Sequence, residues 1–223
     1  MPELTLEDYL SQIRTHPDAD VRRNAAWVLG RQRDPRILPA LMAAVNDADS
    51  SVRLRVAESL GVWRDESVTS ALLRLLQDAD SDVRAQAAQS LGQGEHHSAL
   101  AALLAAVNDP EDEVRATAIE ALGKLADAEA APTLGLALTD DDSLIRFQAL
   151  QSLLLLPAEA TQSALLALLP TVEAARLPPL LETLGRIGST ETFDLISAFS
   201  THPDEAVQGA AEWAMEQIKA RST

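Results

Sequence analysis

Histidines and acidic residues are the side chains of this sequence whose types could form a chemical site. His96 and His97 follow Glu95 in "GEHHSAL", and imidazole nitrogens beside a carboxylate can bind a transition metal. A built metal site needs a third or fourth fixed ligand with supporting hydrogen bonds, and this motif supplies none. His16 and His202 both stand in "THPD", where we expect turn residues ahead of a helix. The sequence therefore predicts no metal and no cofactor.

Other catalytic signatures are missing from the sequence. The 223 residues include no Cys, so a thiolate nucleophile, a disulfide and a cysteine-based metal site are excluded. The sequence also lacks a glycine-rich phosphate loop, a nucleophile elbow and a zinc motif. No residue is assigned a catalytic role, and enzymatic activity is left open.

The arginines that recur most regularly belong to a pattern that repeats at a fixed interval. "DADSSVRLRVAESLG" at 47–61 restates "HPDADVRRNAAWVLG" at 16–30. Stepping by 31 from Val21 reaches a branched apolar residue at every position except Arg176. The position after this column reads Arg22, Arg53, Arg84, Arg115 and Arg146. Fixed self-similarity of this length indicates a solenoid of stacked units.

Each unit is expected to form two helices. The second begins after an acidic cap such as Asp18, Asp49 or Asp80, and its apolar residues recur at steps of three and four. A glycine such as Gly30 is expected to end it through a left-handed turn. The first helix contributes a buried leucine column. We therefore expect an all-α fold, a right-handed α-solenoid that forms a single domain over 1–223. Its units are roughly 4–30, 35–61, 66–92, 97–123, 128–154, 159–185 and 190–218.

The amino-acid composition and the net charge restrict the kind of partner that the protein can bind. Hydrophobic residues make up 47% and aromatic residues 3%, so Ala, Leu and Val must build the core. The net charge of -16 argues against nucleic acid, whose binding requires Lys and Arg on phosphates. Residues 1–64 carry nine basic and nine acidic residues. The arginines of this neutral end either lie on a solvated surface or form a docking site for an acidic partner.

We expect neither a secretory signal nor a membrane-spanning segment in this sequence. The start, "MPELTLEDYLSQ", lacks the apolar run of a secretory signal, and apolar stretches such as the one around Leu153–Ala158 are too short to span a bilayer. The expectation is a cytoplasmic protein that does not bind membranes.

The repeated pattern "D-x-D-x-x-V-R-x-x-A-A-x-x-L-G" resembles the HEAT-like repeats of phycobilisome lyase subunits, over residues 4–218. The resemblance implies a superhelix whose second helices line a concave face. It also implies a ladder of hydrogen bonds between units, formed by the arginine column with Asp18, Asp49 and Asp80. Related repeats serve as scaffolds, chromophore lyases, hydroxylases and DNA glycosylases. The hydroxylases use His-Glu pairs, which this sequence lacks, and a glycosylase groove requires more Lys and Arg.

Information about a partner is expected where the copies differ. Outward positions of the second helices carry large apolar or arginine side chains at Trp27, Leu54, Arg55, Phe147, Leu155 and Trp213, and Trp and Arg are enriched at binding hot spots. These six residues are the predicted partner-binding residues. Alternatively, the two tryptophans shield the ends of the solenoid.

One unit departs from the pattern as a whole. Between Leu154 and Gly185, "RLPPLLETLG" places Pro178 and Pro179 in the expected second helix. Proline is tolerated only in the first turn of a helix, so this helix is expected to restart near Pro178 and to be short.

The sequence thus predicts a non-catalytic scaffold that binds a protein or peptide partner on the concave face, with an undetermined oligomeric state. The alternative is a bilin lyase subunit or a related tetrapyrrole-handling factor. An engineered, consensus-like repeat protein is a third interpretation, against which the irregular unit and the uneven composition count.

Overall fold

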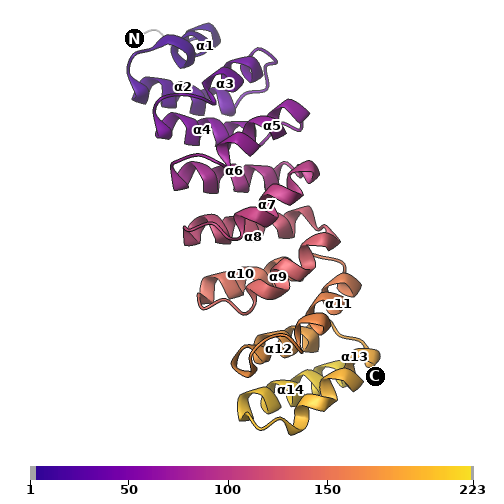
Figure 1. Ribbon diagram of the computed structural model, residues 1–223. Coiled ribbons are helices and arrows are strands. Elements are labelled where there is room, and N and C mark those ends of the chain that lie inside the picture. Colours follow the sequence, from indigo (N-terminus) through magenta and orange to yellow (C-terminus); the bar gives the residue numbers. More distant parts are fainter. Residues whose placement is uncertain (1–3, 222–223) are drawn as a thin grey trace. The chain divides into compact units, whose positions relative to one another are not determined.

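The computed structural model describes residues 4–221, which form helices and turns without a strand (Figure 1). The chain divides into two compact units, one ending at Ala121 and one beginning at Leu122. Helix α8 (Asp112–Leu125) runs through this boundary. The all-α fold predicted from the sequence is confirmed.

The first compact unit is a stack of helical hairpins. Its helices before α8 are α1 (Leu6–Thr15), α2 (Ala19–Gly30), α3 (Ile37–Ala44), α4 (Ser50–Leu60), α5 (Glu66–Leu75), α6 (Ser81–Gln93), the 3₁₀-helix η1 (His97–Ala99) and α7 (Leu100–Ala106). Helix α4 packs between α2 and α6, while α1 packs against α2 and α3. Figure 1 shows the even-numbered helices forming one layer of this unit and the odd-numbered helices the other.

The second compact unit has the same organisation. It contains η2 (Ala128–Ala130), α9 (Ala131–Ala137), α10 (Ser143–Leu153), α11 (Ala158–Leu168), η3 (Ala174–Arg176), α12 (Leu177–Ile187), α13 (Thr190–Ser197), η4 (Ala198–Thr201) and α14 (Glu205–Arg221). Helix α9 packs against α10 and α11, and α12 packs closely along α14. The helix that the sequence places near Pro178 begins at Leu177 and has 11 residues, as many as α10. The expectation that it is short is therefore wrong, because both prolines fit within its first turn.

The core is built from the leucine columns that the repeat predicts. Leu29, Leu60, Leu91 and Leu122 of the second helices, and Leu41, Leu72, Leu103, Leu134 and Leu165 of the first, have no exposed surface. Burying one such side chain stabilises the fold by about 1.5–3 kcal/mol. Each hairpin therefore depends on its neighbours in the stack to cover its apolar face.

The repeated glycines have a different role from the one expected. None of the nine glycines, all within the described residues, has a positive φ, so the predicted left-handed stop is wrong. A Cβ added at Gly61 would lie 2.9 Å from the Cβ of Ser90, and one at Gly92 would lie 2.7 Å from the Cα of Ala121. The glycine column lets neighbouring second helices approach closely. Where serine faces the glycine, Ser90 Oγ also donates to the carbonyl of Ala57 at 2.9 Å.

The left-handed conformation occurs instead just beyond two helix ends, at residues other than glycine. Glu95 follows α6 with φ 53° and Ala126 follows α8 with φ 52°. The amide of Ala126 donates to the carbonyl of Leu122 at 3.2 Å. A side chain at such a position costs about 1–2 kcal/mol relative to glycine.

Candidate functional site

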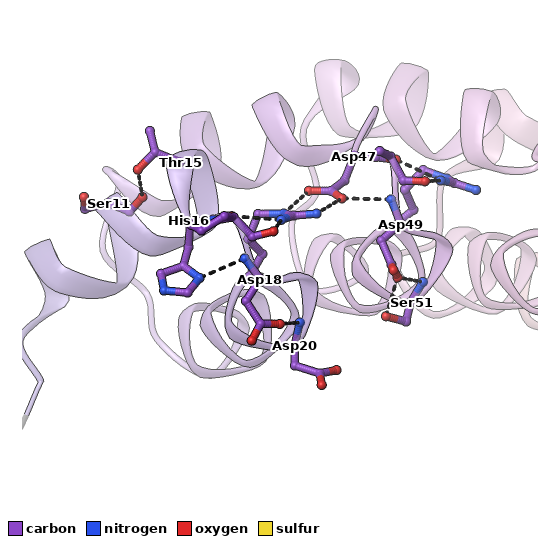
Figure 2. A network of polar contacts seen from close by, with 12 residues as sticks. Ser11, Thr15, His16, Asp18, Asp20, Asp47, Asp49 and Ser51 are labelled. Atoms are coloured by element: carbon purple, nitrogen blue, oxygen red, sulfur yellow. Dashed lines mark hydrogen bonds and ion pairs between the residues drawn. The ribbon is translucent and has the colours of Figure 1, made fainter.

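The arginine column forms a ladder between neighbouring hairpins of the first compact unit. The Nε and Nη2 of Arg22 each donate to a carboxylate oxygen of Asp47 at 2.7 Å (Figure 2). Arg53 binds Asp78 and Arg84 binds Asp109 with the same two-point geometry at 2.7–2.8 Å. The remaining nitrogen, Nη1, donates to carbonyl groups in the loop before the arginine's own helix, such as His16 O at 2.8 Å. Each arginine thus ties its own loop to the next one.

The carboxylates of this ladder lie two positions before those expected. Asp18, Asp49 and Asp80 serve as helix caps, since their side chains accept from the amides of Asp20, Ser51 and Asp82 at 2.9–3.0 Å. Their oxygens face their own helix, whereas Asp47, Asp78 and Asp109 in the preceding turn face the neighbouring arginine. Figure 2 shows both roles side by side, with Asp47 on the guanidinium and Asp49 on Ser51.

Burial and hydrogen bonds act in opposite directions on the pKa values of the ladder carboxylates. Burial alone would raise the pKa of Asp47, but hydrogen bonds from Arg22 and from the Asp49 amide outweigh burial and lower that pKa. For Asp109, the hydrogen bonds from Arg84 are the largest influence and lower its pKa. These carboxylates therefore stay ionised and paired at neutral pH.

Two arginines of the column have other partners. Arg115 donates to the carbonyl of Asp109 at 2.9 Å and forms an ion pair with Asp112. Arg146 donates through Nη1 to the carbonyls of Asp140 and Asp141 at 2.8 and 2.9 Å. In the unit that follows Arg146, the column of ladder aspartates holds Thr171, which has no carboxylate to continue the ladder.

His16 and His202 occupy the column that holds the ladder aspartates in other units. The Nδ1 of His16 accepts from the amide of Asp18, and that of His202 from the amide of Asp204, both at 3.1 Å. Asp47 makes the equivalent bond to the amide of Asp49 at 3.0 Å. The histidine side chain thus keeps the turn-forming bond of the aspartate, and it does not bind an arginine of the ladder. This agrees with the expected role of both histidines as turn residues.

The side chains of "GEHHSAL" point to different partners. His96 is buried, and its Nδ1 lies 2.7 Å from the hydroxyl of Thr69. Glu95 pairs with Arg64 at 3.1 Å. Within residues 4–221, His, Cys, Asp and Glu side chains form no group of three or more that could hold a metal ion.

Two of the predicted partner-binding residues, Trp27 and Arg55, line one surface hollow in the first compact unit. The hollow measures about 210 Å³, and Arg23 and Asn24 complete its lining. Trp27 is 43% exposed, and the guanidinium carbon of Arg31 lies 4.9 Å from its ring centre. Leu54, the residue before Arg55 in the sequence, is half-buried.

In the second compact unit, α10 and the turn that follows it expose apolar side chains. Leu144 and Phe147 of α10 are 60% and 57% exposed. Leu155, which the sequence placed on this second helix, lies instead in the turn after its last residue, Leu153, and is 59% exposed. Sequence analysis missed Leu144, although its column holds Asp20, Ser51, Asp82 and Glu113 in the preceding units. The change from polar residues to leucine was the available signal. Trp213 of α14 is half-buried, and its ring centre lies 5.6 Å from the Arg186 guanidinium.

Stacked helical hairpins tied by repeated glycines and arginines define an α-solenoid repeat protein. The family model for HEAT repeats matches residues 6–92, 69–154 and 100–176. The chain belongs to the HEAT repeat family.

Solved structures share this fold at low sequence identity. A chain in the complex of CpcE and CpcF of phycocyanin lyase from Nostoc sp. PCC7120 aligns with a TM-score of 0.64 and 22% identity, over 100% of this chain and 90% of that one. An engineered protein aligns with a TM-score of 0.55 and 20% identity, over 98% of both chains. A designed armadillo repeat protein in complex with the peptide (KR)4 aligns at 0.53 and 17% identity, over 96% of this chain and 100% of that one. No curated protein matches the chain.

The length and hydropathy of a helix decide whether it can cross a membrane. Among residues 4–221, every helix is too short or too polar to cross a bilayer.

Proposed function

We propose that this protein is a non-catalytic scaffold that binds a protein or peptide partner on the outward face of its second helices. The observation that carries the proposal is the pair of apolar side chains Leu144 and Phe147, which lie three positions apart on one face of α10, together with Leu155 two residues beyond the end of that helix. Each of these three side chains is more than half exposed. Large contiguous apolar patches on a protein surface commonly mark contact sites.

The other proposed contacts are Trp27, Leu54 and Arg55 in the first compact unit and Trp213 in the second. Trp27 and Trp213 each have an arginine guanidinium over the ring, and rigid aromatic and arginine side chains contribute strongly to binding. The hollow between Trp27 and Arg55 adds a recess that a partner side chain could fill.

Proteins of similar fold bind partners in known complexes. The designed armadillo protein holds the peptide (KR)4, and the CpcE and CpcF chains form a complex with each other. Both cases support a binding role for stacked hairpins, although they share only the fold with this chain.

The test is partner capture from native cell extract with a variant that combines Phe147→Ala and Trp213→Ala. The matched control is Leu195→Ala, which removes an apolar side chain that is 55% exposed on α13, a first helix. We expect the double variant to lose partners that the unaltered protein and the control retain, as measured by quantitative mass spectrometry. Circular dichroism verifies that helix content is unchanged. Equal capture by all three proteins would refute binding on this face.

Bilin handling is the second candidate, since the chain aligns over its full length with a phycocyanin lyase subunit. Incubating the protein with a bilin and its apoprotein acceptor tests it by absorbance. A spectral shift that requires the protein would favour this candidate over the scaffold.

A further inference from the structure

The hollow between α2 and α4 combines cationic and aromatic groups in a way that specifies a ligand chemistry. We propose that it binds the carboxylate side chain of an acidic segment of the partner, next to an apolar side chain that covers Trp27. This inference rests on the proposed scaffold function and adds the chemical class of the segment bound at this end of the chain.

The guanidinium of Arg55 supplies the main argument. Its Nη1 pairs with Glu58, whereas its Nε is buried and has no hydrogen-bond partner among the described residues. In Arg22, Arg53 and Arg84, the Nε donates to an aspartate as one half of a two-point contact. An unpaired buried donor is costly. The Nε is covered in this conformation, whereas the Arg55 side chain as a whole is 29% exposed. A carboxylate in the hollow is therefore bound when the guanidinium turns its edge toward it, and this turn gives the Nε the acceptor that it lacks.

The surrounding charges favour a singly charged acceptor. Arg23 pairs with Asp20 at 2.8 Å and Arg55 pairs with Glu58, while the guanidinium of Arg31 lies over Trp27. The two arginines that line the hollow are each balanced by one acidic residue, and Arg31 adds one positive charge beside Trp27. This surplus matches a carboxylate better than a doubly charged phosphate.

The other lining residues suit a peptide chain. Asn24 is exposed, and its amide can donate to and accept from a peptide backbone. Trp27 offers an apolar ring face at the edge of the hollow, and aromatic side chains anchor segments at interfaces.

The distribution of charge along the chain directs an acidic segment to this end. The net charge of -16 arises beyond residue 64, because residues 1–64 carry nine basic and nine acidic side chains. A negatively charged segment is repelled by the acidic surface and is not repelled at the neutral end.

The test uses the purified full-length protein and fluorescence anisotropy. The probe is a short fluorescein-labelled peptide that alternates Glu and Leu, and the matched probes replace every Glu with Gln, Lys or phosphoserine. Arg55→Gln removes the proposed donor. Arg55→Lys keeps the positive charge and removes the guanidinium edge that donates two hydrogen bonds to one carboxylate. Arg74→Gln is the control, since it removes one positive charge from α5, where Arg74 bonds to Asn46.

We expect the Glu peptide to bind more tightly than the Gln, Lys and phosphoserine peptides. Arg55→Gln should weaken Glu-peptide binding by about tenfold or more, Arg55→Lys should weaken it measurably, and Arg74→Gln should leave it within about twofold. Binding that is equal for the Glu and Gln peptides, strongest for the phosphoserine peptide, or insensitive to both Arg55 variants would overturn the inference. Because these assays do not use the α10 face, they fail independently of the capture experiment that tests the scaffold function.

Discussion

The close helix contact at the repeated glycines predicts whether replacing a glycine with alanine stabilises or destabilises the protein. Two glycines of the second compact unit allow a direct comparison. A Cβ at Gly185 of α12 would lie 2.7 Å from the Cα of Ala214 and 2.9 Å from Cζ3 of Trp213. At Gly209 of α14, a Cβ would have nothing within 4 Å. The two glycines therefore share helical geometry and differ in the space around them.

The expected energies follow from two opposing effects. Replacing glycine with alanine inside a helix stabilises it by about 1 kcal/mol. At Gly185 the new methyl group meets backbone atoms, and overpacking of this kind costs about 1–3 kcal/mol or more. Gly185→Ala should therefore lower the free energy of unfolding by about 1–2 kcal/mol, while Gly209→Ala should raise it by up to about 1 kcal/mol.

Thermal unfolding followed by circular dichroism measures this difference. Each kcal/mol shifts the Tm of a chain of this size by roughly 2–4 °C, so the two variants should move the Tm in opposite directions. Equal stabilisation by both variants would falsify the assignment of the glycine column to close helix packing.

Three further predictions concern polar and backbone features. Arg53→Gln leaves the largely buried Asp78 without its two-point partner and should cost about 2 kcal/mol or more in urea unfolding, while Arg36→Gln, in an exposed ion pair, should barely move the midpoint. Burial, aided by Arg64, lowers the pKa of His96 from its ordinary value of 6.5, so the unfolded chain binds the proton more tightly. Stability should then fall as pH drops from 7 through 6.5 and below, and His96→Gln should remove this part of the pH profile. Ala126→Gly should raise the free energy of unfolding by up to about 1 kcal/mol and so raise the Tm, because glycine adopts the positive φ of this position at a lower cost than alanine. A lower Tm would contradict this interpretation.

The helices and their core were predictable because the repeat places equivalent core residues at a fixed interval. Leu41, Leu72 and Leu103 stand in one column and all prove fully buried. Periodicity reveals which residues share an environment, and a column that is apolar in every unit indicates burial. Leu144, whose column is polar in the preceding units, is exposed.

Contacts between residues of two different columns were harder to predict. The repeat length shows which residues are equivalent, but it does not show how many positions separate two residues that interact. Asp47 and Asp49 stand in parallel acidic columns, and only the structure shows which one reaches Arg22. One signal was available in the column of Asp47. This column keeps its carboxylate in the units that follow Arg22, Arg53, Arg84 and Arg115. It changes to Thr171 after Arg146 and to His202 after Leu177.

The glycine column was misinterpreted for a related reason. Glycine near a helix end suggests a left-handed turn, but Gly61 serves a contact with Ser90 of the next second helix. The small residues Ser59, Ser90 and Ala121, which share one column, indicated this role.

The candidate site was predicted in part. Trp27 and Arg55 were selected from separate units of the repeat, and the structure places them around one hollow. The orphaned Nε of Arg55 depends on side-chain orientation and could not be predicted from residue types.

The arginine ladder joins only adjacent hairpins, since Arg22, Arg53 and Arg84 each bind the aspartate in the turn of the next unit. Excising one complete period from the interior, such as residues 66–96, would therefore bring Arg53 into register with Asp109 and leave the junction chemically equivalent. Duplicating a period would extend the stack in the same way. Gain or loss of a whole period between Arg22 and Asp109 would thus change the length of the stack and keep the arginine–aspartate contact at the new junction.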